Sequence, residues 1–306
     1  SFVSLKLFPS VIYIITAFAI YKLSNNIGID KNSSIRCSLT FLLIPAVTFS
    51  SFILSTDLFL LLFWTLSLSE LVKIQRIPKF KNFILLGVFL GLGFLSKYAA
   101  IYFIICVLVY VLIDKNFRAF FFKNYIGFFL SLCCILLIVF PNLMWNFNNG
   151  WVTFSHTSDN ANFDNIKIDL TRGFIFLFIQ ILMIGPFIFL GSIIGYKKLS
   201  FNKNDKFLLI FSLPILLIVF VEAIIVRANA NWAAPALISL FLFLYTCCKG
   251  EVFKKLNLFF NFSFCVIFFV LVGLSHDSNI FKRVSGLDNF AESIYLERLD
   301  KNIVDI

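Results

Sequence analysis

The chain has 306 residues, of which 60% are hydrophobic and only 14% are charged, and its formal net charge is +10. Soluble globular domains carry about 25% charged residues, so this composition excludes an ordinary soluble domain and indicates a polytopic membrane protein. The seven cysteines lie in or beside apolar stretches without CxxC or Cys/His spacing, so neither a zinc site nor a disulfide is predicted.

Ten apolar stretches are candidate membrane spans, because a spanning helix needs about 20 mostly apolar residues. In chain order they are 5–23, 37–54, 57–72, 83–96, 98–113, 120–140, 172–195, 207–226, 232–247 and 256–274. We therefore predict an all-α integral membrane protein with about ten transmembrane helices. The fourth and fifth stretches meet at 96–98, either as two helices with a tight turn or as one broken element. We assign 1–274 to one polytopic transmembrane domain and 275–306 to the start of an outer C-terminal region that is cut short.

The connections between these stretches alternate in charge, and one set holds most of the 26 lysines and arginines. This basic set comprises 22–36, 73–81, 114–123, 196–206 and 248–255. Positive charge gathers in the cytoplasmic loops of membrane proteins, so we place these loops in the cytoplasm. The net charge then reflects topology, and no nucleic-acid partner is expected. Asp57, Lys97, the 141–171 loop and Arg227 face outward.

The 141–171 loop is the longest connection, and it is both polar and aromatic. Long structured loops are usually functional, so we expect any chemistry on this outer side. Trp145, Asn146 and Trp151 either stack on a sugar or sit in the headgroup belt, where tryptophan is common. His156 is one of only two histidines, and it is either structural or catalytic.

Two charged residues mark the outer ends of predicted helices. Asp57 opens the third stretch, in SSFILSTDLFLLLFW, where Ser55, Thr56 or Asp57 itself can cap the helix. Alternatively, this carboxylate binds a metal or a substrate hydroxyl. Lys97 ends the fourth stretch, in GLGFLSKYAA, beside Tyr98. It is either an interfacial lysine whose ammonium reaches water or a cation for a lipid phosphate.

A further polar group lies in VFVEAIIVRANANWAAPAL. Glu222 is about one turn inside the eighth stretch, and an ionisable residue within a span indicates a functional site. We expect Arg227 to be its partner, although an i, i+5 spacing is imperfect for a helix pair. Arg227 followed by Asn229, Asn231 and Trp232 is typical of a site for an anionic or sugar group.

These outward motifs resemble, in this order, the family 39 glycosyltransferases. These are the bacterial relatives of dolichyl-phosphate-mannose protein mannosyltransferases and of the aminoarabinose transferase that modifies lipid A. The matching sequences are FVSLKLFPSVIYIITAFAIYKLSNNIG, STDLFLLLFWTLSL, LGVFLGLGFLSKYAAIYFI, FPNLMWNFNNGWVTFSHTSDNAN and RANANWAAPAL. The segment KRVSGLDNFAESI also looks like the start of the outer C-terminal region of such proteins.

The resemblance implies a C-type glycosyltransferase fold, present here in part. It implies transfer of a sugar from a polyprenyl-phosphate donor to a lipid, glycan or protein acceptor. A carboxylate acts as general base on the acceptor, and cations or a metal stabilise the departing lipid phosphate. The implied location is the bacterial inner (plasma) membrane, with the active site facing the periplasm or exterior.

The resemblance also assigns roles to residues. The family's base is an aspartate in the first outer loop, and the chain starts at what corresponds to the second span, so we expect the principal base to be absent from it. Asp57 matches the family's second acidic position, which implies a supporting carboxylate that can hold a divalent metal. Lys97 and Arg227 match phosphate contacts. The predicted substrate-binding residues are Lys97, Tyr98, Trp145, Asn146, His156, Glu222, Arg227, Asn231 and Trp232.

Two other functions stay open. A transporter or flippase of a lipid-linked intermediate would show intramembrane charges near the middle of the bilayer and inverted repeats. Here the ionisable residues cluster at the outer ends of the spans, and no repeat is visible. The remaining alternative is a membrane scaffold without catalytic activity, or the product of a degenerate gene.

Overall fold

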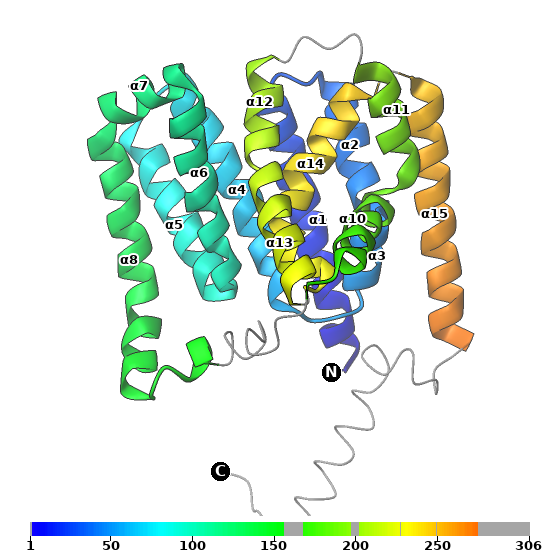
Figure 1. Ribbon diagram of the computed structural model, residues 1–306, viewed down its shortest axis with the longest axis horizontal. Helices are drawn as coiled ribbons and strands as arrows, with labels where there is room; N and C mark the ends of the chain where they lie inside the picture. The colour runs from blue at the N-terminus through cyan, green and yellow to red at the C-terminus, as the bar shows by residue number, and fades with distance from the viewer. Residues whose placement is uncertain (1, 156–167, 197–201, 227, 249, 275–306) are drawn as a thin grey trace, which may run out of the picture.

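The chain folds as a bundle of α-helices. The computed structural model describes residues 2–155, 168–196, 202–226, 228–248 and 250–274, and all regular secondary structure within these ranges is helical (Figure 1). The α-helices are α1 (Phe2–Asn26), α2 (Lys31–Leu43), α3 (Pro45–Ser50), α4 (Thr56–Arg76), α5 (Phe80–Ser96), α6 (Ile101–Ile113), α7 (Lys115–Lys123), α8 (Tyr125–Asn148), α10 (Leu170–Ile184), α11 (Pro186–Tyr196), α12 (Lys203–Ile210), α13 (Leu213–Ile225), α14 (Ala234–Cys247) and α15 (Glu251–Leu274). Two short 3₁₀ helices, η1 (Tyr98–Ala100) and η3 (Ala230–Ala233), precede α6 and α14.

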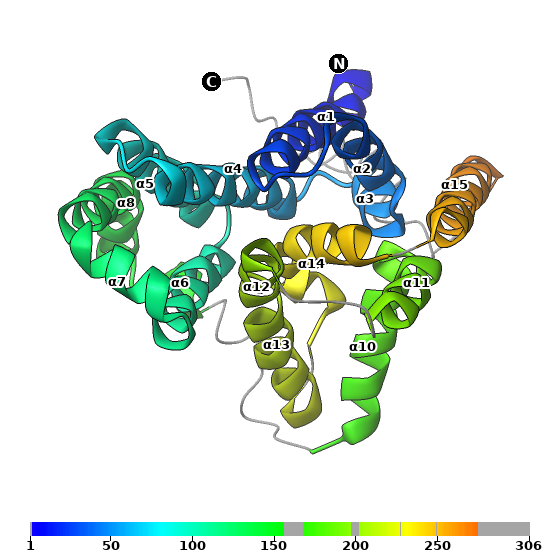
Figure 2. The ribbon, with the colours of Figure 1, turned by 90° about the horizontal axis from the view of Figure 1, so that it is seen from above.

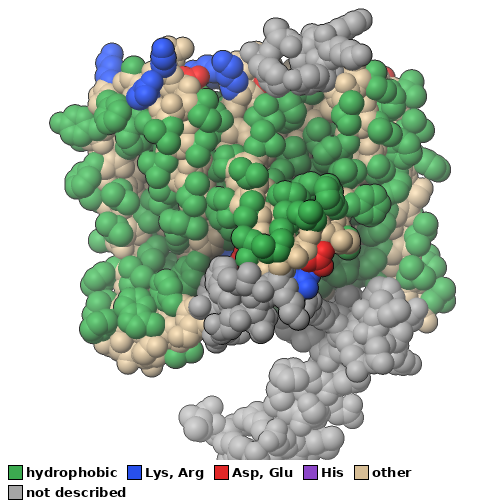
Figure 3. All heavy atoms as spheres, in the orientation of Figure 1, with side chains coloured by type: hydrophobic (Ala, Val, Ile, Leu, Met, Phe, Trp, Pro, Cys, Tyr) green, Lys and Arg blue, Asp and Glu red, His purple; other side chains and the backbone are tan. Residues whose placement is uncertain are grey.

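The surface of the bundle is that of a membrane protein. Among the described residues, five segments are individually long and apolar enough to cross a membrane, and two bent helix pairs raise this number to seven. Large apolar side chains point outward, such as Leu137 in α8, which is 78% exposed, and Phe259 in α15, which is 71% exposed. Figure 3 shows the resulting apolar surface on one face of the molecule. Exposed apolar surface of this extent requires a lipid environment, which confirms the predicted all-α integral membrane protein.

All ten predicted stretches are helical, but several boundaries differ from the prediction. The predicted stretch 37–54 begins earlier, at Lys31, and is broken into α2 and α3 at Ile44. Ile44 has an extended backbone, with φ −63° and ψ 142°, because the proline at position 45 disfavours a helical conformation in the residue before it. After the break, residues of α3 line the cavity described below.

The sixth predicted stretch, 120–140, combines parts of two helices. α7 is separate and lies at 113° to α6, with its first turn capped by the Asp114 carboxylate, which accepts a 2.8 Å hydrogen bond from the Phe117 amide. α8 then continues through Pro141 to Asn148, so the first eight residues of the predicted 141–171 loop are helical. Proline is tolerated within membrane helices because neighbouring groups satisfy the backbone that it leaves unpaired.

The two ends of the bundle differ in charge, as the alternating loops predict. Figure 1 shows the connections α1–α2, α4–α5, α6–α7 and α14–α15 at one end, which we call the basic end. Lysines and arginines gather there in Figure 3. Figure 1 places the α3–α4, α5–α6 and α13–α14 connections at the opposite end, which we call the Asp57 end.

Helices close in sequence also pack side by side. Figure 2 shows α4 between α1 and α5, with α8 on the far side of α5, and α14 facing α4 from the other half of the bundle. The α5–α8 contact is close because Gly87 faces α8: a Cβ at this position would lie 2.4 Å from the Ser131 carbonyl oxygen. These contacts hold the first turn of α4 and the end of α5 next to each other at the Asp57 end.

Candidate active site

Asp57 lies in the first turn of α4 and is only 8% exposed. A carboxylate in the first turn is favoured by the helix dipole, which explains its place in the helix but not its partners. The residue at the N-cap is Ser55, and neither carboxylate oxygen of Asp57 is occupied by the helix itself. Both oxygens instead bond to side chains from other parts of the chain, so the predicted capping role does not account for this residue.

Lys97 provides the first of these partners. Its ammonium lies 2.7 Å from Asp57 Oδ1, and its side chain is 26% exposed. α5 ends at Ser96, and the backbone of Lys97 is extended, with φ −161°, so the lysine side chain leaves the helix axis toward α4. η1 and α6 follow directly, so the α5–α6 junction is a tight turn between two helices rather than one broken element. An ammonium has three donors, and the ion pair with Asp57 uses one of them.

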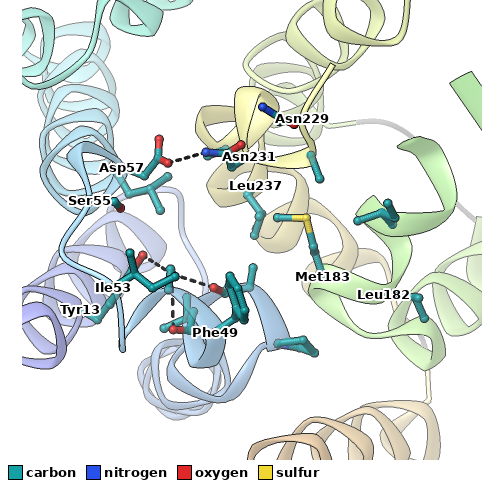
Figure 4. A pocket seen from close by; sticks show the side chains of 18 of the residues that line it. Tyr13, Phe49, Ile53, Ser55, Asp57, Leu182, Met183, Asn229, Asn231 and Leu237 are labelled. Carbon is teal, nitrogen blue, oxygen red and sulfur yellow. Dashed lines mark hydrogen bonds between the residues drawn. The ribbon is translucent and has the colours of Figure 1, made fainter. Parts of the chain in front are cut away.

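Asn231 provides the second partner. Its Nδ2 donates a 2.9 Å hydrogen bond to Asp57 Oδ2, as the dashed line in Figure 4 shows. Asn231 lies in η3, and the Gln180 side chain of α10 holds this short helix by donating a 3.0 Å hydrogen bond to the Ala230 carbonyl. Three segments that are far apart in sequence therefore meet at one carboxylate.

The Asp57–Asn231 pair lies on the wall of a cavity of about 1150 Å³. One part of the cavity is polar and is lined by Tyr13, Ser50, Ser55, Asp57, Asn229 and Asn231. Another part is apolar and is lined by residues of α3, α10 and α15, among them Phe49, Leu182, Met183, Phe260 and Phe264. Figure 4 shows the labelled polar and apolar side chains around this space. The cavity can therefore accept a ligand with a polar group at one end and a hydrocarbon chain at the other.

The cavity includes polar residues that the sequence analysis did not select as site residues. Tyr13 of α1 is 2% exposed, and its hydroxyl lies 2.5 Å from Ser50 Oγ. Ser55 lies just before α4, and Asn229 lies just before η3. A lone tyrosine in the apolar run SVIYIITAF was a weak signal for Tyr13, since tyrosine is also common in membrane cores and interfaces.

Three other predicted site residues lie together in a second cluster around η1 and the end of α8. The Tyr98 hydroxyl donates a 2.9 Å hydrogen bond to Asn142 Oδ1, and the Tyr98 ring stacks on Phe154 with a centroid distance of 4.9 Å. Asn146 is fully buried and accepts a hydrogen bond from the Thr153 amide. Trp145, on the same helix end, is 53% exposed. In the described residues these contacts tie the start of the long loop to η1 and α8, outside the lining of the cavity.

The remaining predicted residues are spread more widely. Trp232 lines the cavity beside Asn231. Glu222 lies in α13, near Tyr102 of α6, and is not among the described residues that line the cavity. His156 and Arg227 lie outside the described residues, so the expected Glu222–Arg227 pair stays a prediction.

The predicted metal role of Asp57 stays a prediction. Its two oxygens are engaged by Lys97 and Asn231, and a lysine ammonium is a cation rather than a metal ligand. Within the described ranges, no three His, Cys, Asp or Glu side chains are grouped so that they could hold a metal ion. The donor set around Asp57 instead suits hydrogen bonds and ion pairs with an anionic or hydroxyl-rich ligand.

Comparison with known proteins gives two matches. A family model described as dolichyl-phosphate-mannose-protein mannosyltransferase matches residues 1–145. The lipid A galacturonosyltransferase RgtD of Rhizobium johnstonii (strain DSM 114642 / LMG 32736 / 3841) is 28% identical over 203 residues. This match covers 65% of the chain and 42% of RgtD, so it spans less than half of that protein's length. No solved structure matches the chain significantly.

Proposed function

We propose, on the premise that the chain is a relative of the family 39 glycosyltransferases, that it forms part of a membrane glycosyltransferase with a polyprenyl-phosphate sugar donor. The observation that carries this proposal is the amphipathic cavity, whose polar wall contains the Asp57–Asn231 pair, with Lys97 bonded to Asp57 from beside the cavity. A lipid-linked sugar likewise has a polar part and an apolar part, because an anionic phosphate and a sugar are joined to a long hydrocarbon chain.

The donor's phosphate and sugar lie at the Asp57 end of the cavity in this proposal. Lys97 supplies positive charge there, and its two remaining N–H donors suit a phosphate oxygen. Asp57 holds the ammonium in position, and Asn231 holds Asp57 from the opposite side. The prenyl chain extends along Phe49, Leu182 and the phenylalanines of α15.

The reaction is a substitution at the anomeric carbon of the sugar. An acceptor hydroxyl oxygen forms a bond to this carbon, while the bond from the carbon to the phosphate oxygen breaks and the electron pair leaves with the phosphate. A carboxylate takes the hydroxyl proton, a role that the resemblance places on an aspartate other than Asp57. Lys97 stabilises the charge that develops on the departing phosphate.

The experiment is sugar transfer by the full-length protein from a radiolabelled polyprenyl-phosphate sugar in detergent or proteoliposomes. We expect Lys97→Ala to lower the transfer rate by about 100-fold or more, because it removes a charge that stabilises the transition state. Lys97→Arg should retain part of the activity. Lys79→Ala, an exposed lysine at the basic end of the same helix, should leave the rate unchanged.

Equal transfer rates for Lys97→Ala and the unaltered protein would contradict the phosphate role of Lys97. A protein that moves the labelled lipid between leaflets without cleaving the bond to the sugar would instead support the transporter prediction. The sugar is identified in the same assay by competition with unlabelled donors that differ in the sugar.

A further inference from the structure

The helix pair α10–α11 is bent by 96° at Gly185. α11 has 11 residues and runs from Gly185 to the basic end, a distance of about 16 Å at 1.5 Å per residue. This distance is about half of a typical 30 Å hydrocarbon core, so the bend lies near the middle of the bilayer. Backbone groups left unpaired at this depth need partners within the protein.

Two asparagines of α15 supply these partners. The Nδ2 atoms of Asn257 and Asn261 both donate to the Ile184 carbonyl, at 3.4 and 3.2 Å. Asn257 Oδ1 accepts a 3.1 Å hydrogen bond from the Ile188 amide in the first turn of α11. Both asparagines are buried, with 1% and 0% exposure. Asn257 therefore joins the last carbonyl of α10 to an amide in the first turn of α11, and Asn261 adds a second donor to that carbonyl. Backbone groups at helix ends lack partners within their own helix, so such side-chain bonds satisfy them.

Gly185 fits this arrangement for two reasons. Its φ of 112° is a conformation that residues with a side chain rarely adopt. A Cβ at this position would also lie 2.4 Å from Asn257 Oδ1 and 2.6 Å from Asn261 Oδ1. The close approach of the amides to the backbone thus depends on glycine at the bend.

The asparagine pair lies next to residues of α10 and α15 that line the cavity. Leu182 and Met183 line the cavity from α10, within one turn of Gly185. Phe260 and Phe264 line it from α15, on either side of Asn261. Figure 2 shows α10 running away from α11 and α15 at the bend, so the angle at Gly185 sets the position of the α10 wall.

We infer that Asn257 and Asn261 are positioning residues that fix the angle between α10 and α11 and thereby shape the apolar part of the cavity for a long hydrocarbon chain. This inference rests on the proposed function for the identity of the ligand, but the role of the two asparagines in the bend does not depend on that function. Loss of either amide leaves the Ile184 carbonyl with fewer donors in an apolar setting, so the bend becomes variable.

The first test measures the bend directly. Spin labels replace the exposed residues Phe178 in α10 and Ile193 in α11 of the full-length protein, and electron–electron distances are recorded in proteoliposomes. We expect one narrow distance distribution, which broadens or shifts in Asn257→Leu and in Asn261→Leu. The matched control is Phe262→Leu, an exposed neighbour on the same helix, which should leave the distribution unchanged. Unchanged distributions in both asparagine variants would overturn the inference.

The second test measures binding of two phosphates that share a headgroup, farnesyl phosphate and undecaprenyl phosphate. We expect the asparagine variants to bind farnesyl phosphate as the unaltered protein does, but to bind undecaprenyl phosphate about fivefold more weakly. Equal weakening for both lipids, or for neither, would overturn the role in shaping the cavity. If the unaltered protein binds neither lipid, the proposed function fails, and the distance measurement still decides the role in the bend.

Discussion

At the scale of single residues, the ion pair between Lys97 and Asp57 is the clearest feature of the site. The Asp57 side chain is 12% exposed and that of Lys97 is 26% exposed, so both charges are largely withdrawn from water. A buried charge that loses its partner is costly, whereas removal of both charges costs much less. The pair therefore contributes to the free energy of unfolding, which can be measured separately from catalysis.

We predict that Lys97→Met lowers the free energy of unfolding by about 1–3 kcal/mol, because it leaves the Asp57 carboxylate without its cation. Asp57→Leu should have an effect in the same range, since it also removes the partner of Asn231. The double variant should cost less than the sum of the two single changes by about 1 kcal/mol or more. Unfolding of the purified protein in detergent measures all three, and strictly additive effects would contradict a direct ion pair.

Sequence reasoning selected Asp57, Lys97, Asn231 and Trp232 as site residues, and the structure places all four at or beside one cavity. It also selected Tyr98 and Asn146, which the structure places in a separate hydrogen-bonded cluster. The sequence shows that a polar residue lies at an outer helix end, but it does not show in which direction the side chain of that residue points. This direction decides whether a side chain faces the cavity or a neighbouring helix.

At the scale of helices, a glycine of α5 allows this helix to pack closely against α8. Gly87 faces α8 so closely that a Cβ would lie 2.4 Å from the Ser131 backbone oxygen. Ser131 Oγ in turn donates a 2.7 Å hydrogen bond to the Phe83 carbonyl of α5. Small residues let membrane helices approach in this way, and polar side chains then bond across the contact.

We predict that Gly87→Ala destabilises the protein by about 1–3 kcal/mol, because α5 and α8 have to move apart. Gly93→Ala on the same helix is the matched control, since its Cβ would lie 3.6 Å from the nearest atom, an ordinary contact. This control should be neutral or stabilising by up to about 1 kcal/mol, as alanine favours a helix. Thermal unfolding in detergent compares the two, and equal effects would show that the α5–α8 contact is looser than the structure indicates.

At the scale of the whole molecule, the charge difference between the two ends predicts the orientation in the membrane. Loops rich in lysine and arginine stay in the cytoplasm, so the Asp57 end should face outward. The cavity and the ion pair would then be open to lipid-linked substrates on the outer side, in agreement with the proposed function.

Cysteine labelling of intact cells tests this orientation. We expect a membrane-impermeant maleimide to label Asn149→Cys, at the exposed end beyond α8, and to label Asn116→Cys in α7 only after the membrane is permeabilised. The protein with its native cysteines alone sets the background. The reverse pattern would place the Asp57 end in the cytoplasm and would rule out an acceptor on the outer side.

The sequence by itself determined the class of the molecule, the approximate position of the helical stretches and the end of the bundle at which the loops within the described residues lie. These properties follow from local composition, because apolar length and loop charge act on each segment almost independently. Only the tertiary structure decided the bend at Gly185 and the meeting of Lys97, Asn231 and Asp57. These features depend on hydrogen bonds between segments that are up to 174 residues apart, and the pattern within one segment carries no information about which distant side chain completes them.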